Sequence, residues 1–247
     1  MRNPPNQNST GGGHRYPAPH LSPATPLDIP VLAEVIIAAH TQDLFGWLSF
    51  PSEADKRNAV AILIKDLEKG LANPGIRVVK AVDVESGEIA AVAVWKFRGH
   101  RFDEIEEGLD VLSLLSGVGT RAEDPRKRMG DYLGMKFLEF FTAWSDSTKH
   151  LYLAFLMTAP RFQRRGYGTA LLKWGHEIAD KGGLPLFLVA SPVGHPLYLH
   201  QGWKDVHEYI NLDLKEWVEG ASGGDRGWGT YTFYPMMKLP VTGEKER

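Results

Sequence analysis

Residues Leu151 to Leu172 read LYLAFLMTAPRFQRRGYGTALL, which is an apolar run, a glycine-containing loop and a second apolar run. The first run, Leu151 to Met157, is almost entirely apolar, as expected of a strand that is buried on both faces. A helical pattern from Thr169 to Lys181 is followed by another apolar run, Leu184 to Ala190. A strand, a helix and a strand with short connections predict two strands that pair in parallel.

Two glycines shape the loop between the first strand and the helix. Gly166 and Gly168 permit a sharp turn and let a bulky anion approach where a Cβ atom would obstruct it. The free N–H groups of the first helical turn then point at that anion, and the helix dipole favours it. Arg164 and Arg165 add charge for phosphate oxygens, although either is equally compatible with a solvated surface position. We interpret the loop as a pyrophosphate-binding site.

Two other classes of phosphate loop do not fit the segment. It lacks the Gly-Lys-Ser/Thr ending of a nucleotide-triphosphate loop. Its two glycines also do not make the three-glycine fingerprint of dinucleotide-binding proteins. The loop therefore belongs to another kind of anion site.

In this context the segment resembles the GCN5-related N-acetyltransferases, whose signature is Gln/Arg-x-x-Gly-x-Gly/Ala between a strand and a helix. Gln163, Gly166 and Gly168 match that signature. The further matches, at the distances that the family uses, are Ala190-Ser191-Pro192, Leu197-Tyr198 and Gly202-Trp203. The resemblance extends from about Tyr152 to Val206 and is to fungal members in particular. Over residues 25 to 150 it is limited to a helix-helix-strand-strand order.

The resemblance implies an acyl-CoA N-acyltransferase fold of the α/β class. Its central sheet is expected to be mixed and mostly antiparallel, with a splayed parallel strand pair and flanking helices. Acetyl-CoA is the implied co-substrate, and its acyl-pantetheine arm would lie in the gap between the splayed strands. The residues implied for its binding are Leu156, Met157, Thr158, Gln163, Arg164, Arg165, Gly166, Tyr167, Gly168 and Thr169.

The family's chemistry places one further side chain. In such enzymes an amine attacks the thioester directly, and a backbone N–H group stabilises the developing oxyanion. No acyl-enzyme is needed, which suits a chain without cysteine. Tyr198 aligns with the tyrosine that protonates the departing thiolate in many relatives, so we expect it to be the general acid. The alternative is a tyrosine that packs under the late strands with its hydroxyl at the surface.

The general base is not indicated by the two apolar strands, because neither contains an acidic residue. His195, His40, Asp43 and Asp131 are candidates, and each also has an interpretation as a surface or capping residue. The missing acid keeps a second function open, a non-catalytic module that senses acyl-CoA or scaffolds a partner. A chromatin-directed or toxin-like acetyltransferase is a third possibility.

The acceptor is expected to be a primary amine of a small molecule or peptide. Its identity depends on the loops at 41–55, 98–130 and 215–230. Apolar residues at 109–115, together with Phe45, Trp47 and Phe50, favour an arylalkylamine-like or other partly apolar acceptor.

Composition sets limits on the remaining functions. The net charge of −2 provides no field that would hold nucleic acid or an anionic membrane. No apolar run is long enough for a signal peptide or a membrane span, so we expect a cytoplasmic protein. With no cysteine and no histidine pair at zinc-ligand spacing, we expect no metal. A monomer and a homodimer are both compatible with the sequence.

The chain of 247 residues is expected to form one folded domain with two tails. Residues 1–22 are rich in Pro, Gly, Asn and Ser and predict a flexible tail. The acyltransferase domain would span 23–240, with an insertion or lid at 98–130, and 241–247 would be a second tail. The expected helices lie at about 28–40, 59–70, 131–145, 169–181 and 196–200. The expected strands lie at 76–84, 89–97, 151–157, 184–190, 206–214 and 231–239, and the basic run 121–128 is expected to be a solvated loop.

Overall fold

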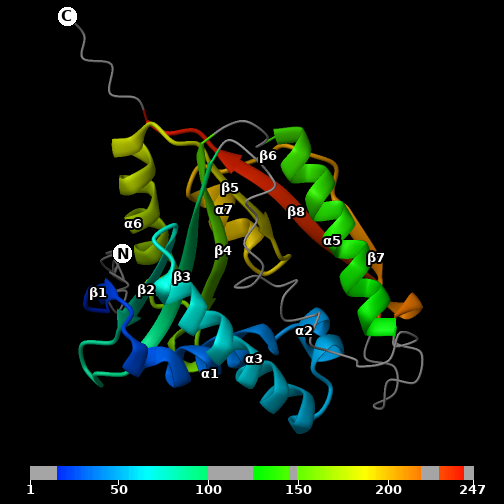
Figure 1. Ribbon diagram of the computed structural model, residues 1–247, viewed down its shortest axis with the longest axis horizontal. Helices are drawn as coiled ribbons and strands as arrows, with labels where there is room; N and C mark the ends of the chain where they lie inside the picture. The colour runs from blue at the N-terminus through cyan, green and yellow to red at the C-terminus, as the bar shows by residue number, and fades with distance from the viewer. Residues whose placement is uncertain (1–15, 100–124, 145–148, 218–227, 242–247) are drawn as a thin grey trace, which may run out of the picture.

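The computed structural model describes residues 16–99, 125–144, 149–217 and 228–241. Most of the predicted lid at 98–130, and the outer parts of both predicted tails, lie outside these residues. Figure 1 shows a central twisted sheet with helices on both of its faces.

The sheet is mixed and mostly antiparallel, which confirms the expected fold class. Its strands are β1 (His20–Pro23), β2 (Ile76–Val82), β3 (Ile89–Arg98), β4 (His150–Thr158), β5 (Leu186–Ala190), β6 (Lys204–Asp205), β7 (Ile210–Asp213) and β8 (Thr230–Lys238). They are ordered β1-β2-β3-β4-β5-β8-β6, and β7 also pairs with β8. Among these strands, β4 and β5 form the parallel pair that the sequence predicted.

Except for α2, each helix of the described residues overlaps a predicted one. They are α1 (Ile29–His40), α2 (Leu44–Ser49), α3 (Glu53–Ala72), α5 (Pro125–Trp144), α6 (Tyr167–Gly182) and α7 (His195–His200). Three short 3-10 turns accompany them, η1 (Pro26–Asp28), η3 (Pro160–Phe162) and η4 (Leu214–Glu216). Helix α3 begins with a capping box between Ser52 and Asp55, which satisfies backbone donors of its first turn.

Three sequence-based boundaries are corrected by the structure. Three of the four residues of β1 fall inside the predicted tail 1–22, because the backbone of β1 pairs with the edge of β2 and needs little from its side chains. Helix α5 begins at Pro125, so residues 125–128 of the predicted basic loop form its first turn, a position that proline tolerates. Helix α2 was not predicted, because its six residues are too few to show a helical period.

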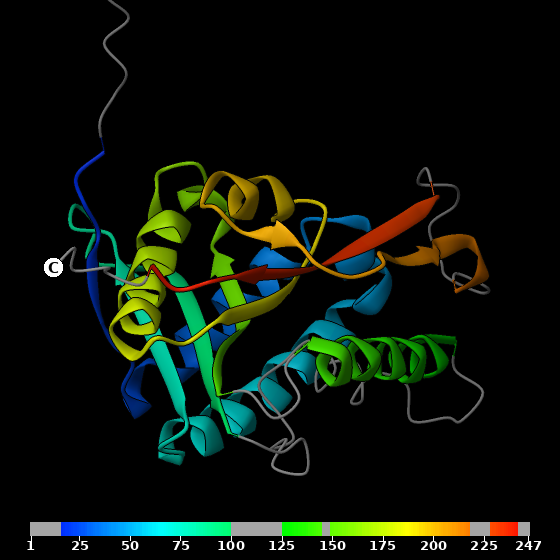
Figure 2. The same ribbon diagram turned by 90° about the horizontal axis from the view of Figure 1, so that it is seen from above.

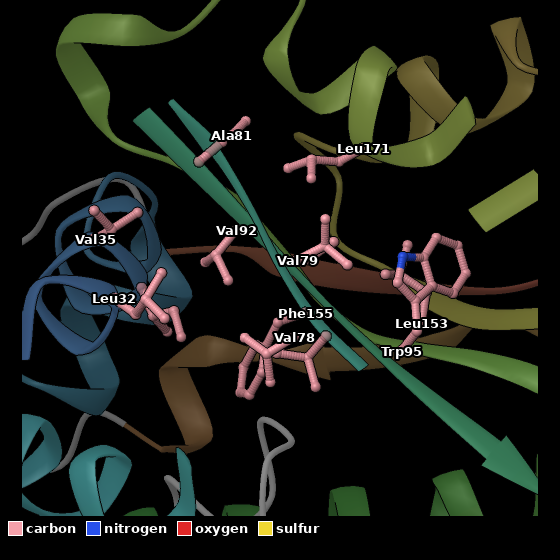
Figure 3. Packing of buried hydrophobic residues seen from close by; sticks show 14 of the residues in the cluster. Leu32, Val35, Val78, Val79, Ala81, Val92, Trp95, Leu153, Phe155 and Leu171 are labelled. Carbon is pink, nitrogen blue, oxygen red and sulfur yellow. The ribbon is translucent and has the colours of Figure 1, made fainter. Parts of the chain in front are cut away.

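The main core fills both faces of the sheet. Leu32 and Val35 of α1 lie on one side of β2 and β3, and Leu171 of α6 lies on the other (Figure 3). Full burial of one such side chain contributes about 1.5–3 kcal/mol, so the two helical layers fix the strands between them. This double burial explains why β4 and β5 are apolar on both faces.

A second core joins α2 and α5 to the β7–β8 pair. Its fully buried members are Phe45, Leu48, Met129, Leu133, Phe137, Ile210, Leu212, Leu214, Tyr231 and Phe233. Figure 2 shows α5 and the β7–β8 pair extending to one side of the molecule, away from α6. Because α2 contributes Phe45 and Leu48 to this core, the short helix is held against β8.

Helix α6 approaches β3 so closely that a side chain at Gly175 has no room. A Cβ atom at Gly175 would overlap the indole ring of Trp95, which is fully buried. We expect Gly175→Ala to lower the free energy of unfolding by about 1–3 kcal/mol through overpacking. Gly168→Ala is the matched control in the same helix, because its Cβ would meet neighbours at ordinary distances, 3.5 Å or more. Urea unfolding measures both variants, and equal stabilities would contradict the prediction.

Candidate active site

Strands β4 and β5 are paired over only part of their length. The parallel register joins Leu151 to Leu186 and Tyr152 to Phe187, whereas β4 continues to Thr158. On its other side β4 stays paired with β3, but the register shifts so that Ala154 becomes an extra residue. Such a bulge bends a strand, and here it lies just beyond the last β4–β5 pair. The carboxyl ends of the two strands therefore separate.

The bulged part of β4 presents backbone groups to the gap beside β5. The Ala159 N–H group donates to the Ala90 carbonyl of β3 at 2.9 Å. Because antiparallel pairs alternate, Met157 also turns its backbone groups to β3, while Leu156 and Thr158 turn theirs the opposite way. Of the three predicted contacts on this strand, Leu156 and Thr158 thus face the gap. On the same side of the strand, the Gln163 Nε2 atom donates to the Thr158 carbonyl at 3.2 Å, which leaves the Thr158 N–H group for a ligand.

The loop after β4 has the geometry of an anion site. Gly166 caps α6 with φ +90°, in the left-handed region, and Arg164 has φ +63°. Left-handed residues at alternate positions of a loop, as Arg164 and Gly166 are here, direct successive N–H groups to one side of the loop. Apart from its chain neighbours, none of the described residues has a heavy atom within 4 Å of the position where a Gly166 Cβ would stand. The start of the 16-residue helix α6 is therefore open at this position, as an anion site requires.

The side chains of the loop divide between solvent and protein. Arg164 is exposed, whereas the Arg165 guanidinium lies 5.1 Å from the Tyr16 ring and 5.4 Å from the Phe162 ring. Tyr167 is buried, so toward an anion this residue offers only its backbone. A Cβ at Gly168 would lie 3.5 Å from Leu197, which shows that the first turn of α6 packs against α7.

The β2–β3 turn anchors this loop. The buried Tyr167 hydroxyl donates a short hydrogen bond to Asp83, whose other carboxylate oxygen accepts from the Ser86 amide at 2.9 Å. The hydrogen bond from Tyr167 lowers the pKa of Asp83, while burial, followed by the bond to Asp83, raises the pKa of Tyr167 to about 12. Arg161 adds an exposed ion pair with Glu88 at 2.7 Å. The sequence predicted the turn but gave no signal for its bond to Tyr167.

Tyr198 lies on α7, close to the start of α6. The side chain is 8% exposed, and its ring lies 5.9 Å from the ring of Trp203. Burial raises the pKa of Tyr198 well above its usual value of 10. The phenol therefore keeps its proton at neutral pH, as a proton donor must.

The four candidate bases fall into three places. His40 and Asp43 lie together at the start of α2, where the His40 Nε2 atom is buried and has no hydrogen-bond partner among the described residues. His195 Nε2 is 2.8 Å from Asp205, and its ring stacks on Tyr234 at 3.8 Å. Asp131 is 68% exposed at its side chain and pairs with Lys127 on the surface of α5.

The aromatic residues expected near an acceptor are partly core residues. Phe45 is 1% and Phe50 0% exposed, so neither presents a surface to a ligand. The expectation is therefore wrong for both residues. The Phe45 ring packs in the second core and the Phe50 ring packs in the main core. Trp47 is half-buried, and its ring lies 5.5 Å from that of Trp228. The Trp47–Trp228 pair is therefore the part of the expected aromatic surface that stays accessible.

Other features of the described part of the chain bear on ligands. Over the ranges between residues 16 and 241 that the structure describes, three or more His, Cys, Asp or Glu side chains nowhere gather as metal ligands would. None of the helices described is both long enough and apolar enough to cross a membrane.

A parallel strand pair that opens beside the start of a helix is the arrangement expected of the GCN5-related N-acetyltransferase fold. Residues 125–203 match the model described as the acetyltransferase (GNAT) family. An acetyltransferase of the fungus Stachybotrys chartarum is 32% identical over 77 residues, which cover 29% of this chain and 34% of the relative. The match thus spans about a third of that relative's length.

Solved structures share the fold over nearly the whole chain. One is from Corynebacterium glutamicum and is described as histone acetyltransferase HPA2 and related acetyltransferase. It is 22% identical, with a TM-score of 0.58 over 92% of this chain and 99% of that one. Another, arylalkylamine N-acetyltransferase 2 from Aedes aegypti, is 14% identical, with a TM-score of 0.57 over 90% and 98% of the two chains. At these identities the likeness shows the fold.

The bond between Tyr167 and Asp83 predicts a pH-dependent stability. Tyr167→Phe should lower the melting temperature near pH 7, because it removes the donor that holds the Asp83 carboxylate. The folded pKa of Asp83 lies below its ordinary 3.8. The bond therefore contributes stability above about pH 4, and this contribution disappears as the pH falls through the lowered value. Melting curves of both proteins from pH 7 to pH 3 test this, and a difference that does not shrink in acid would exclude the bond as its source.

Proposed function

We propose that the protein transfers the acetyl group of acetyl-CoA to a primary amine by direct attack. The observation that carries this proposal is the opened β4–β5 pair, whose gap leads to the Gly166 loop at the start of α6. A thioester arm needs backbone partners along a strand, and its pyrophosphate needs free N–H groups at a helix start. In this chain the strand β4 leads directly through the Gly166 loop to the start of α6, so the two features are adjacent.

Each part of the cofactor has a counterpart in the chain. The loop from Gln163 to Thr169 would hold the pyrophosphate, chiefly through backbone N–H groups. Leu156 and Thr158 would pair with the pantetheine arm, and a backbone N–H group of β4 would stabilise the oxyanion.

The reaction balances without an acyl-enzyme. The acceptor ammonium first loses a proton to solvent, and its nitrogen then attacks the thioester carbon. The C–S bond breaks, Tyr198 gives its proton to the CoA sulfur, and the surplus proton on nitrogen restores the phenol. The chain has no cysteine that would form an acyl intermediate.

We infer that the acceptor carries an apolar or aromatic group. The half-buried Trp47–Trp228 pair supports this, because Trp47 lies on α2, the helix that follows α1. An arylalkylamine N-acetyltransferase shares the fold, which makes arylalkylamines the first compounds to screen. Preference for polyamines or aminoglycosides in such a screen would contradict this choice.

Gly166→Asp is the sharpest test of the cofactor site. The left-handed φ of +90° disfavours any side chain, and a carboxylate there would repel the pyrophosphate. We expect acetyl-CoA affinity in calorimetry to fall at least about 100-fold, because charge-assisted hydrogen bonds contribute about 1.5–3 kcal/mol each.

Gly183→Asp is the matched control at the other end of α6. Gly183 has φ +63° and open space around its Cβ position, so the two variants share the backbone strain. The control should bind acetyl-CoA like the wild type. Failure of the wild type to bind acetyl-CoA would refute the proposed function. Binding without any amine-dependent CoA release would favour the non-catalytic acyl-CoA sensor, a reading that the lack of an acid on β4 and β5 supports.

Tyr198→Phe tests the general acid. We expect kcat to fall about 100-fold or more, which is typical for loss of general acid catalysis, with acetyl-CoA affinity unchanged. Free CoA is measured with a thiol reagent, and a chain without cysteine gives no background. Tyr209→Phe, which alters an exposed tyrosine, is the control. An unchanged kcat would remove Tyr198 from the mechanism.

A further inference from the structure

Asp43 is held beside β8 by two neutral donors. One carboxylate oxygen accepts from the Gly46 amide at 2.9 Å, and the other accepts from the Tyr231 hydroxyl at 2.6 Å. Tyr231 is 188 residues away in the sequence and is brought there by the second core. Gly46 lies so close to the His40 carbonyl that a Cβ would overlap it, which packs the end of α1 against α2. The position of this carboxylate is therefore fixed from both sides.

The negative charge of Asp43 has no cationic partner in the described part of the chain. The titratable groups that face it are His40 on α1 and Tyr231 on β8. Burial lowers the pKa of His40 in spite of the nearby carboxylate, so the imidazole is neutral at physiological pH. Burial and Asp43 raise the pKa of Tyr231, so the phenol is neutral as well. A half-buried carboxylate without a counter-ion is costly, and a cationic ligand would offset that cost.

Asp43 is also connected to the open end of the strand pair. The Ser191 hydroxyl interacts with the Tyr231 hydroxyl, and Ser191 directly follows β5. The Gly194 amide donates to the Ser191 Oγ atom at 3.2 Å, and Gly194 precedes α7, the helix that carries Tyr198. Tyr231 thus links the Asp43 carboxylate to the residue that follows the carboxyl end of β5.

Trp47 lies one helical turn after Asp43. The Trp47 amide donates to the Asp43 carbonyl at 3.0 Å, and residues four apart share one side of a helix. The Trp47 ring contacts Trp228, so a negative charge and an aromatic surface adjoin each other. A ligand that suits both has a positive charge and an apolar group a few bonds apart.

We propose that the Asp43 carboxylate binds the ammonium group of the acceptor, with the apolar part of the acceptor against Trp47 and Trp228. An ammonium group has three donors, and a carboxylate with two neutral donors still has lone pairs to accept them. This inference rests on the proposed function, since it identifies the acceptor of that same site as a cationic amine with an apolar substituent. Tyr231 and His40 position the carboxylate and do not contact the acceptor's charge.

The test compares two ligands that differ in charge. Phenethylamine and its neutral counterpart 2-phenylethanol are titrated into wild type and Asp43→Asn, each with and without bound CoA. Asparagine is as good a helix cap as aspartate. Its Oδ1 atom can still accept from Gly46, whereas its Nδ2 atom would donate to the Tyr231 hydroxyl, so the variant removes the charge and reverses one hydrogen bond. We expect phenethylamine affinity to fall about 10–100-fold in Asp43→Asn, as for loss of a hydrogen bond between charged groups. The affinity for 2-phenylethanol should not change.

Glu53→Gln is the control, because it removes an exposed charge from α3. It should leave both ligands and acetyl-CoA unaffected. Equal affinity of Asp43→Asn and wild type for phenethylamine would overturn the inference, as would a wild type that does not distinguish the amine from the alcohol. Neither result affects the proposed function, which fails separately if the wild type does not bind acetyl-CoA.

Discussion

Every element of the site depends on the unequal pairing of β4. Along one edge the strand stays bonded to β3 as far as Thr158, and along the other it pairs with β5 at only two positions. The bulge at Ala154 makes this possible, since it bends β4 away while its hydrogen bonds to β3 continue on both sides of the extra residue. The result is a strand edge inside the molecule whose backbone groups face a gap.

Leu156 and Thr158, whose backbone groups form this edge, are half-buried. The surrounding layers hold the edge in place, since α1 and α3 cover one face of the sheet and α6 covers the other. Gly175 and Trp95 make the approach of α6 especially close. Helix α6 therefore begins at a fixed place, directly after the loop that leaves the end of β4.

The sequence predicted the local part of this arrangement well. Strand β4, the Gly166 loop, helix α6 and strand β5 follow one another in the chain, so apolar runs and glycines sufficed to predict them. The parallel pairing of β4 with β5 followed from the short connections. Helix α2 and strand β1 escaped prediction because they are short and are stabilised by partners far away in the chain. The aromatic residues Phe45 and Phe50 were assigned to a ligand surface because composition cannot distinguish a core ring from an exposed one.

The tertiary contacts of the site could not be predicted from the sequence, because they also join residues that are far apart in the chain. Asp83 meets Tyr167 and Asp43 meets Tyr231 across long stretches of chain, and no spacing rule connects either pair. Both are carboxylate–phenol bonds, but their settings differ. Asp83 also holds Ser86 and lies near Arg165, so its charge is used to fix the β2–β3 turn under the anion loop. Asp43 has only neutral partners among the described residues, and the same kind of bond there leaves its charge available to a ligand. The two carboxylates thus differ in whether a cation lies nearby: Asp83 supports the Gly166 loop beside Arg165, whereas the charge of Asp43 is left for the amine that we propose.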